Sequence, residues 1–210
     1  MLHKIAVFAS GRGSNFQAVY KKIQSGDIRA KISLLITNKS GAGAIDFARA
    51  HDIDVAVIPP GKFESPTAFG KAVLASLAEH RIQLIVLAGY LRKIPENVIC
   101  AYPNKIINVH PSLLPAFGGK GMYGMNVHQA VFTSGVKVSG ITVHFVDNKY
   151  DTGPILMQRA VDISSCGSPE EIAAVVLQEE HRSLPEAVKL LTERKIDVED
   201  KRVLVGDDNR

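Results

Sequence analysis

The chain has no tryptophan, only two cysteines, and no apolar run near the ~20 residues that a membrane-spanning helix needs. Cys100 and Cys166 lie far apart, a spacing that fits neither a disulfide framework nor a metal motif. We therefore expect a reducing, cytoplasmic location and no bound metal. The first apolar residues give way to a glycine-rich turn too soon to form a signal peptide.

Basic residues exceed acidic ones, with a formal net charge of +4, but they are scattered along the chain. The longest basic run is a pair, as at Lys21–Lys22. A nucleic-acid-binding protein usually gathers its lysines and arginines on one face, with aromatic residues or a known module alongside. We therefore expect no nucleic-acid partner and no membrane association, and a mildly basic surface that suits small anionic substrates. The sequence is silent on oligomeric state.

Short apolar runs alternate with amphipathic segments through the first half of the chain, and the 210 residues suit one domain with a full core. This alternation predicts an α/β fold: a Rossmann-like, mostly parallel, twisted sheet with helices on both faces. The expected strands are 4–9, 32–37, 55–58, 84–88 and 106–110, and the expected helices are 16–23, 44–51 and 67–80, with a turn or short helix near Pro95.

The second half of the chain has a different pattern. Two apolar runs, 138–146 and 155–161, are joined by a polar turn, which predicts antiparallel strands added to the sheet. A capping box with proline at the first helical position, Ser168–Glu171, predicts a last helix that runs towards Leu191. We assign residues 1–195 to the domain and 196–210 to a polar tail that packs loosely.

The segment Gly11–Asn15 connects the first predicted strand to the first predicted helix. Backbone N–H groups and the positive end of the helix dipole make such a loop a ready phosphate site. Gly13, Ser14 and Asn15 are the candidate ligands, although the glycines also suit a simple tight turn capped by Ser14 or Asn15. Phe16 stands where a dinucleotide fingerprint needs glycine, so a phosphate monoester fits better than NAD.

The run Asn108–Pro111 closes the strand predicted at 106–110. Side chains at i and i+2 share a strand face, so Asn108 and His110 point the same way, at the end of the sheet where ligands bind. A carboxamide beside an imidazole suits oxyanion stabilisation and proton transfer. Taken alone, however, the segment favours a structural interpretation, in which Asn108 orders a turn and His110 is a hydrogen-bonded interior histidine.

Other polar residues are ambiguous on sequence grounds. Asp151 lies in the turn before Gly153–Pro154, where an aspartate often bonds only local N–H groups. His128 and His144 lack any metal-ligand spacing. His144 falls on the more polar face of its strand.

These pieces together resemble the phosphoribosylglycinamide formyltransferases, the glycinamide ribonucleotide transformylases of purine biosynthesis. The resemblance extends from about Ile5 to Leu191 and is carried by four segments: 10–15 (SGRGSN), 87–92 (LAGYLR), 108–115 (NVHPSLLP) and 140–154.

The resemblance implies transfer of a formyl group from 10-formyltetrahydrofolate, as co-substrate, to the amine of phosphoribosylglycinamide. Gly13, Ser14 and Asn15 would hold the substrate phosphate, and Glu180 would reach the ribose or glycinamide. The implied folate-binding residues are Leu91, Arg92, Lys93, Ile94, Asn108, Asp147 and Asp151. Asn108, His110 and Asp151 would form the catalytic group, with Asn108 and protonated His110 donating to the oxyanion. The family uses no metal.

Two segments depart from the family pattern. The family often has an arginine on the folate side, where this chain reads Phe63–Pro66, so we expect the folate glutamate tail to be held weakly. The loop 116–125 is longer and richer in glycine than the usual form, and its role cannot be carried over.

Rival interpretations are another folate-dependent formyltransferase acting on a phosphorylated or sugar amine, a formyltetrahydrofolate hydrolase, and a non-catalytic nucleotide- or folate-binding module.

Overall fold

The computed structural model describes residues 2–208. The chain forms two compact units, Met1–Ile107 and Asn108–Arg210, and strand β5 (Ile106–His110) continues from one into the other. The first unit contains the strands β1 (His3–Phe8), β2 (Ala30–Thr37), β3 (Asp54–Val57) and β4 (Leu84–Leu87). Its helices are α1 (Ser14–Gln24), α2 (Ala44–Arg49), the 3-10 helix η1 (Pro60–Lys62), α3 (Pro66–Glu79) and α4 (Glu96–Ala101).

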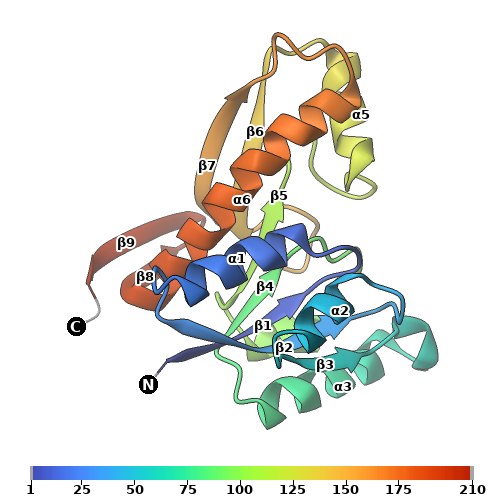
Figure 1. Ribbon diagram of the computed structural model, residues 1–210, viewed down its shortest axis with the longest axis vertical. Helices are drawn as coiled ribbons and strands as arrows, with labels where there is room; N and C mark the ends of the chain where they lie inside the picture. The colour runs from blue at the N-terminus through green and yellow to red at the C-terminus, as the bar shows by residue number, and fades with distance from the viewer. Residues whose placement is uncertain (1, 209–210) are drawn as a thin grey trace. The chain divides into compact units, whose positions relative to one another are not determined.

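The strands of the first unit are parallel where their pairing is defined: β1 pairs with β2 and β4, and β2 pairs with β3. The connections from β1 to β3 move along the sheet in one direction, and the connection through α3 returns past β1 to β4. Since such crossovers are right-handed, α1 and α2 lie on one face and α3 on the other (Figure 1). All four residues of β4 are buried, as expected for a strand covered on both faces.

The second unit contains β6 (Val138–Phe145) and β7 (Ile155–Asp162), which pair antiparallel as predicted. The helices are α5 (Met125–Ser134) and α6 (Pro169–Glu193); α6 runs along the β6–β7 pair and contacts α5 (Figure 1). The strand order β3-β2-β1-β4-β5-β6-β7 confirms the predicted fold class, a mostly parallel α/β sheet with antiparallel additions.

The predicted start of the last helix is confirmed. The Ser168 hydroxyl accepts the backbone N–H of Glu171 at 3.2 Å. The Glu171 carboxylate accepts the N–H of Gly167 at 2.7 Å, one residue before the partner that a capping box uses. The helix continues through Pro185 to Glu193.

Helix α5 and the strand pair β8–β9 (residues 194–208) were not predicted. Helix α5 begins after Gly124 and ends at Gly135, which adopts the left-handed conformation typical of a helix end. Residues expected to form a loosely packed tail instead pair as the antiparallel strands β8 (Arg194–Glu199) and β9 (Arg202–Asp208). The domain boundary at residue 195 stays a prediction.

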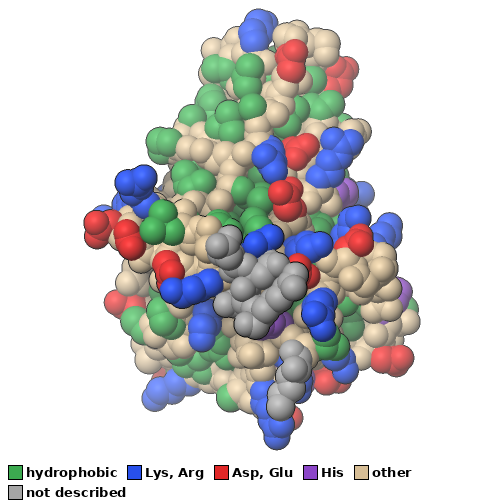
Figure 2. Space-filling view, turned by 90° about the vertical axis from the view of Figure 1, so that its left-hand side faces the viewer, with side chains coloured by type: hydrophobic (Ala, Val, Ile, Leu, Met, Phe, Trp, Pro, Cys, Tyr) green, Lys and Arg blue, Asp and Glu red, His purple; other side chains and the backbone are tan. Residues whose placement is uncertain are grey.

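Positive and negative side chains are interspersed on the face drawn in Figure 2, as the scattered sequence positions indicate. Within residues 2–208, no helix is long and apolar enough to cross a membrane.

Candidate active site

The predicted phosphate loop leads directly into α1. Gly13 is the residue before the helix and has φ 76°, and a Cβ there would lie 2.9 Å from the Cβ of Ala44. Glycine is therefore needed both for the backbone conformation and for the close approach to α2. Gly13 supplies no capping side chain at the N-cap position, and the first turn of the helix has no acidic residue. The start of α1 lies where a strand-to-helix loop can bind an anion, and the phosphate role of Gly13, Ser14 and Asn15 stays a prediction.

The predicted folate segment is tied to the end of β1 by Ser10. The Ser10 hydroxyl donates to Asn38 Oδ1 at 2.6 Å and accepts the N–H of Leu91 at 2.9 Å. Leu91 is 47% exposed, and Ile94 is buried. The segment therefore offers an apolar side chain to a ligand, whereas the backbone N–H of Leu91 already has a partner.

His110 ends β5 and is buried, with 3% of its surface exposed. Its Nδ1 lies 3.7 Å from Asp151 Oδ1, which is ion-pair distance and longer than a hydrogen bond. Its Nε2 donates to the carbonyl oxygen of Phe117 at 2.9 Å. An imidazolium carries N–H on both nitrogens, so the charged ring suits both neighbours.

Asp151 lies in the β6–β7 turn with φ 56°, in the left-handed region. Its Oδ2 accepts the N–H of Gly119 at 2.8 Å. In the same turn, a Cβ on Gly153 would overlap the carbonyl oxygen of Phe145, so only glycine fits there. The structure thus combines the two sequence interpretations of Asp151: it is a turn residue, and its carboxylate faces His110.

The glycine-rich loop, whose role the sequence left open, supplies the backbone groups that hold this pair. Phe117 offers its carbonyl to His110, and Gly119 offers its N–H to Asp151.

Asn108 contacts His144, a residue that sequence reasoning left ambiguous. Asn108 Nδ2 lies 3.2 Å from His144 Nε2, and His144 Nδ1 lies 2.8 Å from the carbonyl oxygen of Phe145. His144 Nε2 is also 3.7 Å from Asp151 Oδ1. The structure therefore brings Asn108, His110 and Asp151 together, as predicted, and adds His144 to the group.

Two histidines near this group have lowered pKa values. Burial is the largest cause for His144; its bond to the Phe145 carbonyl and the charge of Asp151 act in the opposite direction. Burial also lowers the pKa of His128 in α5, and the positive charge of His110 adds to that effect. Within residues 2–208, Nδ1 of His128 has no hydrogen-bond partner.

The turn after His110 is held by the side chain of Thr142, which is fully buried. The Thr142 hydroxyl donates to the carbonyl of Ser112 at 2.7 Å and accepts the N–H of Leu114 at 3.0 Å. Gln158 Nε2 donates to both Thr142 Oγ1 and the Leu114 carbonyl, at 3.0 and 2.9 Å. Strands β6 and β7 therefore fix the backbone that leads away from His110.

The remaining predicted residues lie apart from these contacts. Asp147 is occupied locally, since its carboxylate accepts the hydroxyl of Thr152 and the N–H of Lys149. Glu180 is buried in α6, with 8% of its surface exposed. The binding roles of both residues stay predictions.

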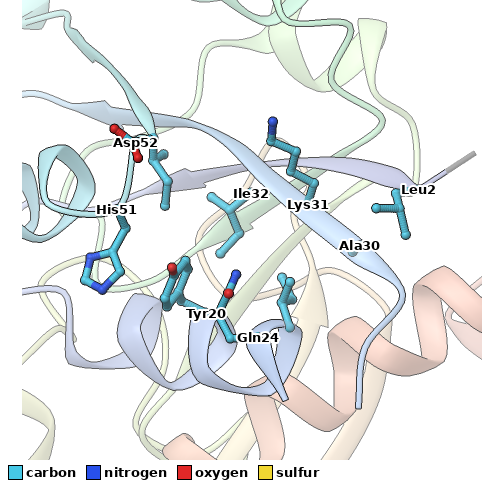
Figure 3. Close-up of a pocket in the computed structure, with 10 residues that line it drawn as sticks. Leu2, Tyr20, Gln24, Ala30, Lys31, Ile32, His51 and Asp52 are labelled. Carbon is cyan, nitrogen blue, oxygen red and sulfur yellow. The ribbon is translucent and has the colours of Figure 1, made fainter. Parts of the chain in front are cut away.

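A pocket of about 320 Å³ lies elsewhere in the first unit (Figure 3). Its walls include Tyr20 and Gln24 of α1, His51 and Asp52 after α2, and the start of β2. It lies at the amino ends of the strands, whereas ligands of doubly wound sheets bind beyond the carboxyl ends. The pocket is therefore distinct from the phosphate loop that follows β1.

The described residues contain no cluster of three His, Cys, Asp or Glu side chains arranged to hold a metal ion. The model of the formyl transferase family matches residues 3–188, which extend through both compact units. The chain belongs to the formyl transferase family.

Named relatives agree with this membership. The phosphoribosylglycinamide formyltransferase of Bacillus subtilis is 42% identical over 90% of this chain and 95% of its own. A chloroplastic phosphoribosylglycinamide formyltransferase of Arabidopsis thaliana is 44% identical over 92% of this chain, which spans 66% of that longer relative. Among solved structures, the chain is similar to the crystal structure of glycinamide ribonucleotide transformylase 1 from Symbiobacterium toebii, with a TM-score of 0.92 and 36% sequence identity. The match covers 98% of this chain and 95% of that one. The resemblance found in the sequence is confirmed.

Proposed function

We propose that the chain transfers the formyl group of 10-formyltetrahydrofolate to the amine of phosphoribosylglycinamide, a step of purine biosynthesis. The observation that carries the proposal is the convergence of Asn108, His110 and Asp151 in one group around the buried ring of His144. A module that only binds a nucleotide or a folate has no need of this combination. The names of the relatives support the choice of substrates.

In this reaction the substrate nitrogen bonds to the formyl carbon, and the bond from that carbon to the folate nitrogen breaks. Asn108 would donate an N–H to the formyl oxygen as it gains negative charge. The substrate nitrogen loses a proton and the folate nitrogen gains one, and Asp151 beside His110 suits that transfer. Because His110 Nε2 is bonded to the Phe117 carbonyl, this nitrogen would have to exchange that bond before it could donate to the oxyanion.

The substrate-binding assignments follow the family residue by residue. Gly13, Ser14 and Asn15 would hold the phosphate, supported by the position of Gly13 at the N-cap of α1 and by the lack of an acidic residue in the first turn. Glu180 would reach the ribose or glycinamide.

On the folate side, the exposed Leu91 and the neighbouring cations fit a flat, partly apolar molecule with an acidic tail. The implied residues are Leu91, Arg92, Lys93, Ile94 and Asp147. Pro66 stands in place of the expected arginine and is the first residue of α3. The helix is capped by Ser65, whose hydroxyl accepts the N–H of Ala68 at 3.1 Å. The glutamate tail would therefore depend on other cations.

A reducing compartment such as the cytoplasm is part of the proposal, supported by the free thiols of Cys100 and Cys166.

The test measures loss of 10-formyltetrahydrofolate with and without phosphoribosylglycinamide. Turnover should need both substrates, whereas a hydrolase would consume the folate alone. Ser14→Asp should raise KM for the phosphorylated substrate through like-charge repulsion and leave KM for the folate unchanged. Turnover with non-phosphorylated amines only, or an unchanged KM in the variant, would refute the phosphate assignment.

A further inference from the structure

His144 lies between a backbone carbonyl and the amide of Asn108, and this position determines which ring nitrogen carries the proton. Nδ1 is 2.8 Å from the carbonyl oxygen of Phe145. A carbonyl oxygen only accepts hydrogen bonds, so Nδ1 must be the N–H donor. The neutral ring then has its lone pair on Nε2, which faces Asn108 Nδ2 at 3.2 Å. Asn108 is therefore the donor in this contact.

The surroundings favour the neutral ring. The side chain of His144 is 3% exposed, and burial is the main cause of its lowered pKa. The charged groups that act on it are His110, which adds to the lowering, and Asp151 and Asp147, which oppose it. The 3.7 Å from Nε2 to Asp151 Oδ1 is too long for a hydrogen bond, so Asp151 does not compete with Asn108 for Nε2.

An asparagine amide can rotate by half a turn and exchange its oxygen and nitrogen at little intrinsic cost. In the rotated form, Asn108 Oδ1 would face the lone pair on His144 Nε2, and the two acceptors would repel each other. The contact therefore selects one of the two orientations. The amide nitrogen carries two N–H groups, so donation to His144 leaves the second for another acceptor.

We propose that His144 is a positioning residue that fixes the amide of Asn108, so that the second N–H is held ready for the formyl oxygen. The proposal rests on the function proposed above for Asn108. Without His144, the amide would divide its time between an orientation that presents N–H and one that presents oxygen.

The matched variants are His144→Gln and His144→Asn. Glutamine can place its amide oxygen near the position of Nε2 and so retain an acceptor for Asn108. The shorter asparagine places its amide near the position of Nδ1 and leaves no acceptor near the position of Nε2. We expect His144→Gln to keep kcat within about fivefold, and His144→Asn to lower kcat roughly 10- to 100-fold with KM unchanged, less than the ~10²–10³ lost with a whole oxyanion donor. A purely structural role would affect both variants according to their stability, so equal kcat in the two would overturn the proposal.

The Asn108→Ala variant distinguishes a failure of the role proposed for His144 from a failure of the function proposed for Asn108. If Asn108→Ala leaves kcat unchanged, the oxyanion role of Asn108 fails and the role of His144 fails with it. If Asn108→Ala lowers kcat but His144→Asn does not, only the role of His144 fails. If both hold, the double variant should be no slower than Asn108→Ala alone, because there is no amide left to orient. Fully additive losses would count against the proposal.

A measurement on the unaltered protein covers the case in which the variants do not fold. Nitrogen NMR shifts of the His144 ring at neutral pH should show a protonated Nδ1 and an unprotonated Nε2. The opposite tautomer, or a charged ring, would contradict the proposal.

Discussion

The hydroxyl of Thr142 offers a direct test of how the strand pair β6–β7 supports the turn after His110. Thr142→Val keeps the shape of the side chain and removes its hydroxyl. Three hydrogen bonds are lost: one to the carbonyl of Ser112, one from the N–H of Leu114 and one from Gln158. Gln158 keeps its bond to the Leu114 carbonyl.

The expected cost follows from the number of bonds and from burial. A net contribution of about 1 kcal/mol for each bond gives about 3 kcal/mol, and the Leu114 N–H is left buried beside a methyl group. In a chain of this size, 1 kcal/mol shifts Tm by about 2–4 °C, so Thr142→Val should lower Tm by about 6–12 °C. Thr142→Ser keeps the hydroxyl and loses one buried methyl, which should cost about 1 kcal/mol.

The assay is thermal or urea unfolding of both variants, with Thr67→Val as a control at an exposed position of α3. Because the affected backbone continues from His110, kcat of Thr142→Val should also fall further than kcat of Thr142→Ser. Equal stability of the Val and Ser variants would refute the idea that the hydroxyl bonds hold this turn.

Three further outcomes are expected. The pKa values of His144 and His128 are lowered in the folded protein, so the unfolded state binds more protons below pH ~6.5. The free energy of unfolding should therefore be level above that pH and fall as the pH drops below it. Urea unfolding at several pH values measures this, and an unchanged free energy down to pH ~5 would contradict it. Asp151→Asn removes the charge beside His110 and should lower kcat by roughly 10²-fold or more with little change in KM, so near-normal steady-state turnover would leave Asp151 an ordinary turn residue. Ser65→Ala removes the cap of α3 and should cost ~1 kcal/mol in urea unfolding without altering kcat; no loss of stability would show that the cap is dispensable.

Most of the sheet could be predicted from the sequence because its signals are local. Strand β5 was predicted with its observed bounds, since a short apolar run ends at a proline. Asn108 and His110 are two residues apart in this strand, so their shared face could also be predicted from the local sequence. Helix α5 was missed because its apolar side is short, although the i, i+4 pair Val127 and Val131 and the terminal Gly135 are a usable signal.

The β8–β9 pair was missed because its many charges suggested a tail. Strand β8 nevertheless alternates half-buried with exposed residues, with Ile196 and Val198 among the half-buried ones. That period of two is the signature of a strand with one covered face.

Half of the contacts in the proposed catalytic group could not be predicted, because backbone atoms make them. The carbonyl of Phe117 binds His110, the carbonyl of Phe145 sets the tautomer of His144, and the N–H of Gly119 binds Asp151. Every residue carries these groups, so no side-chain motif marks which carbonyl or N–H will meet a given imidazole or carboxylate. The sequence could name the titrating side chains, whereas the path of the backbone around them determines which atoms hold protons and which accept them.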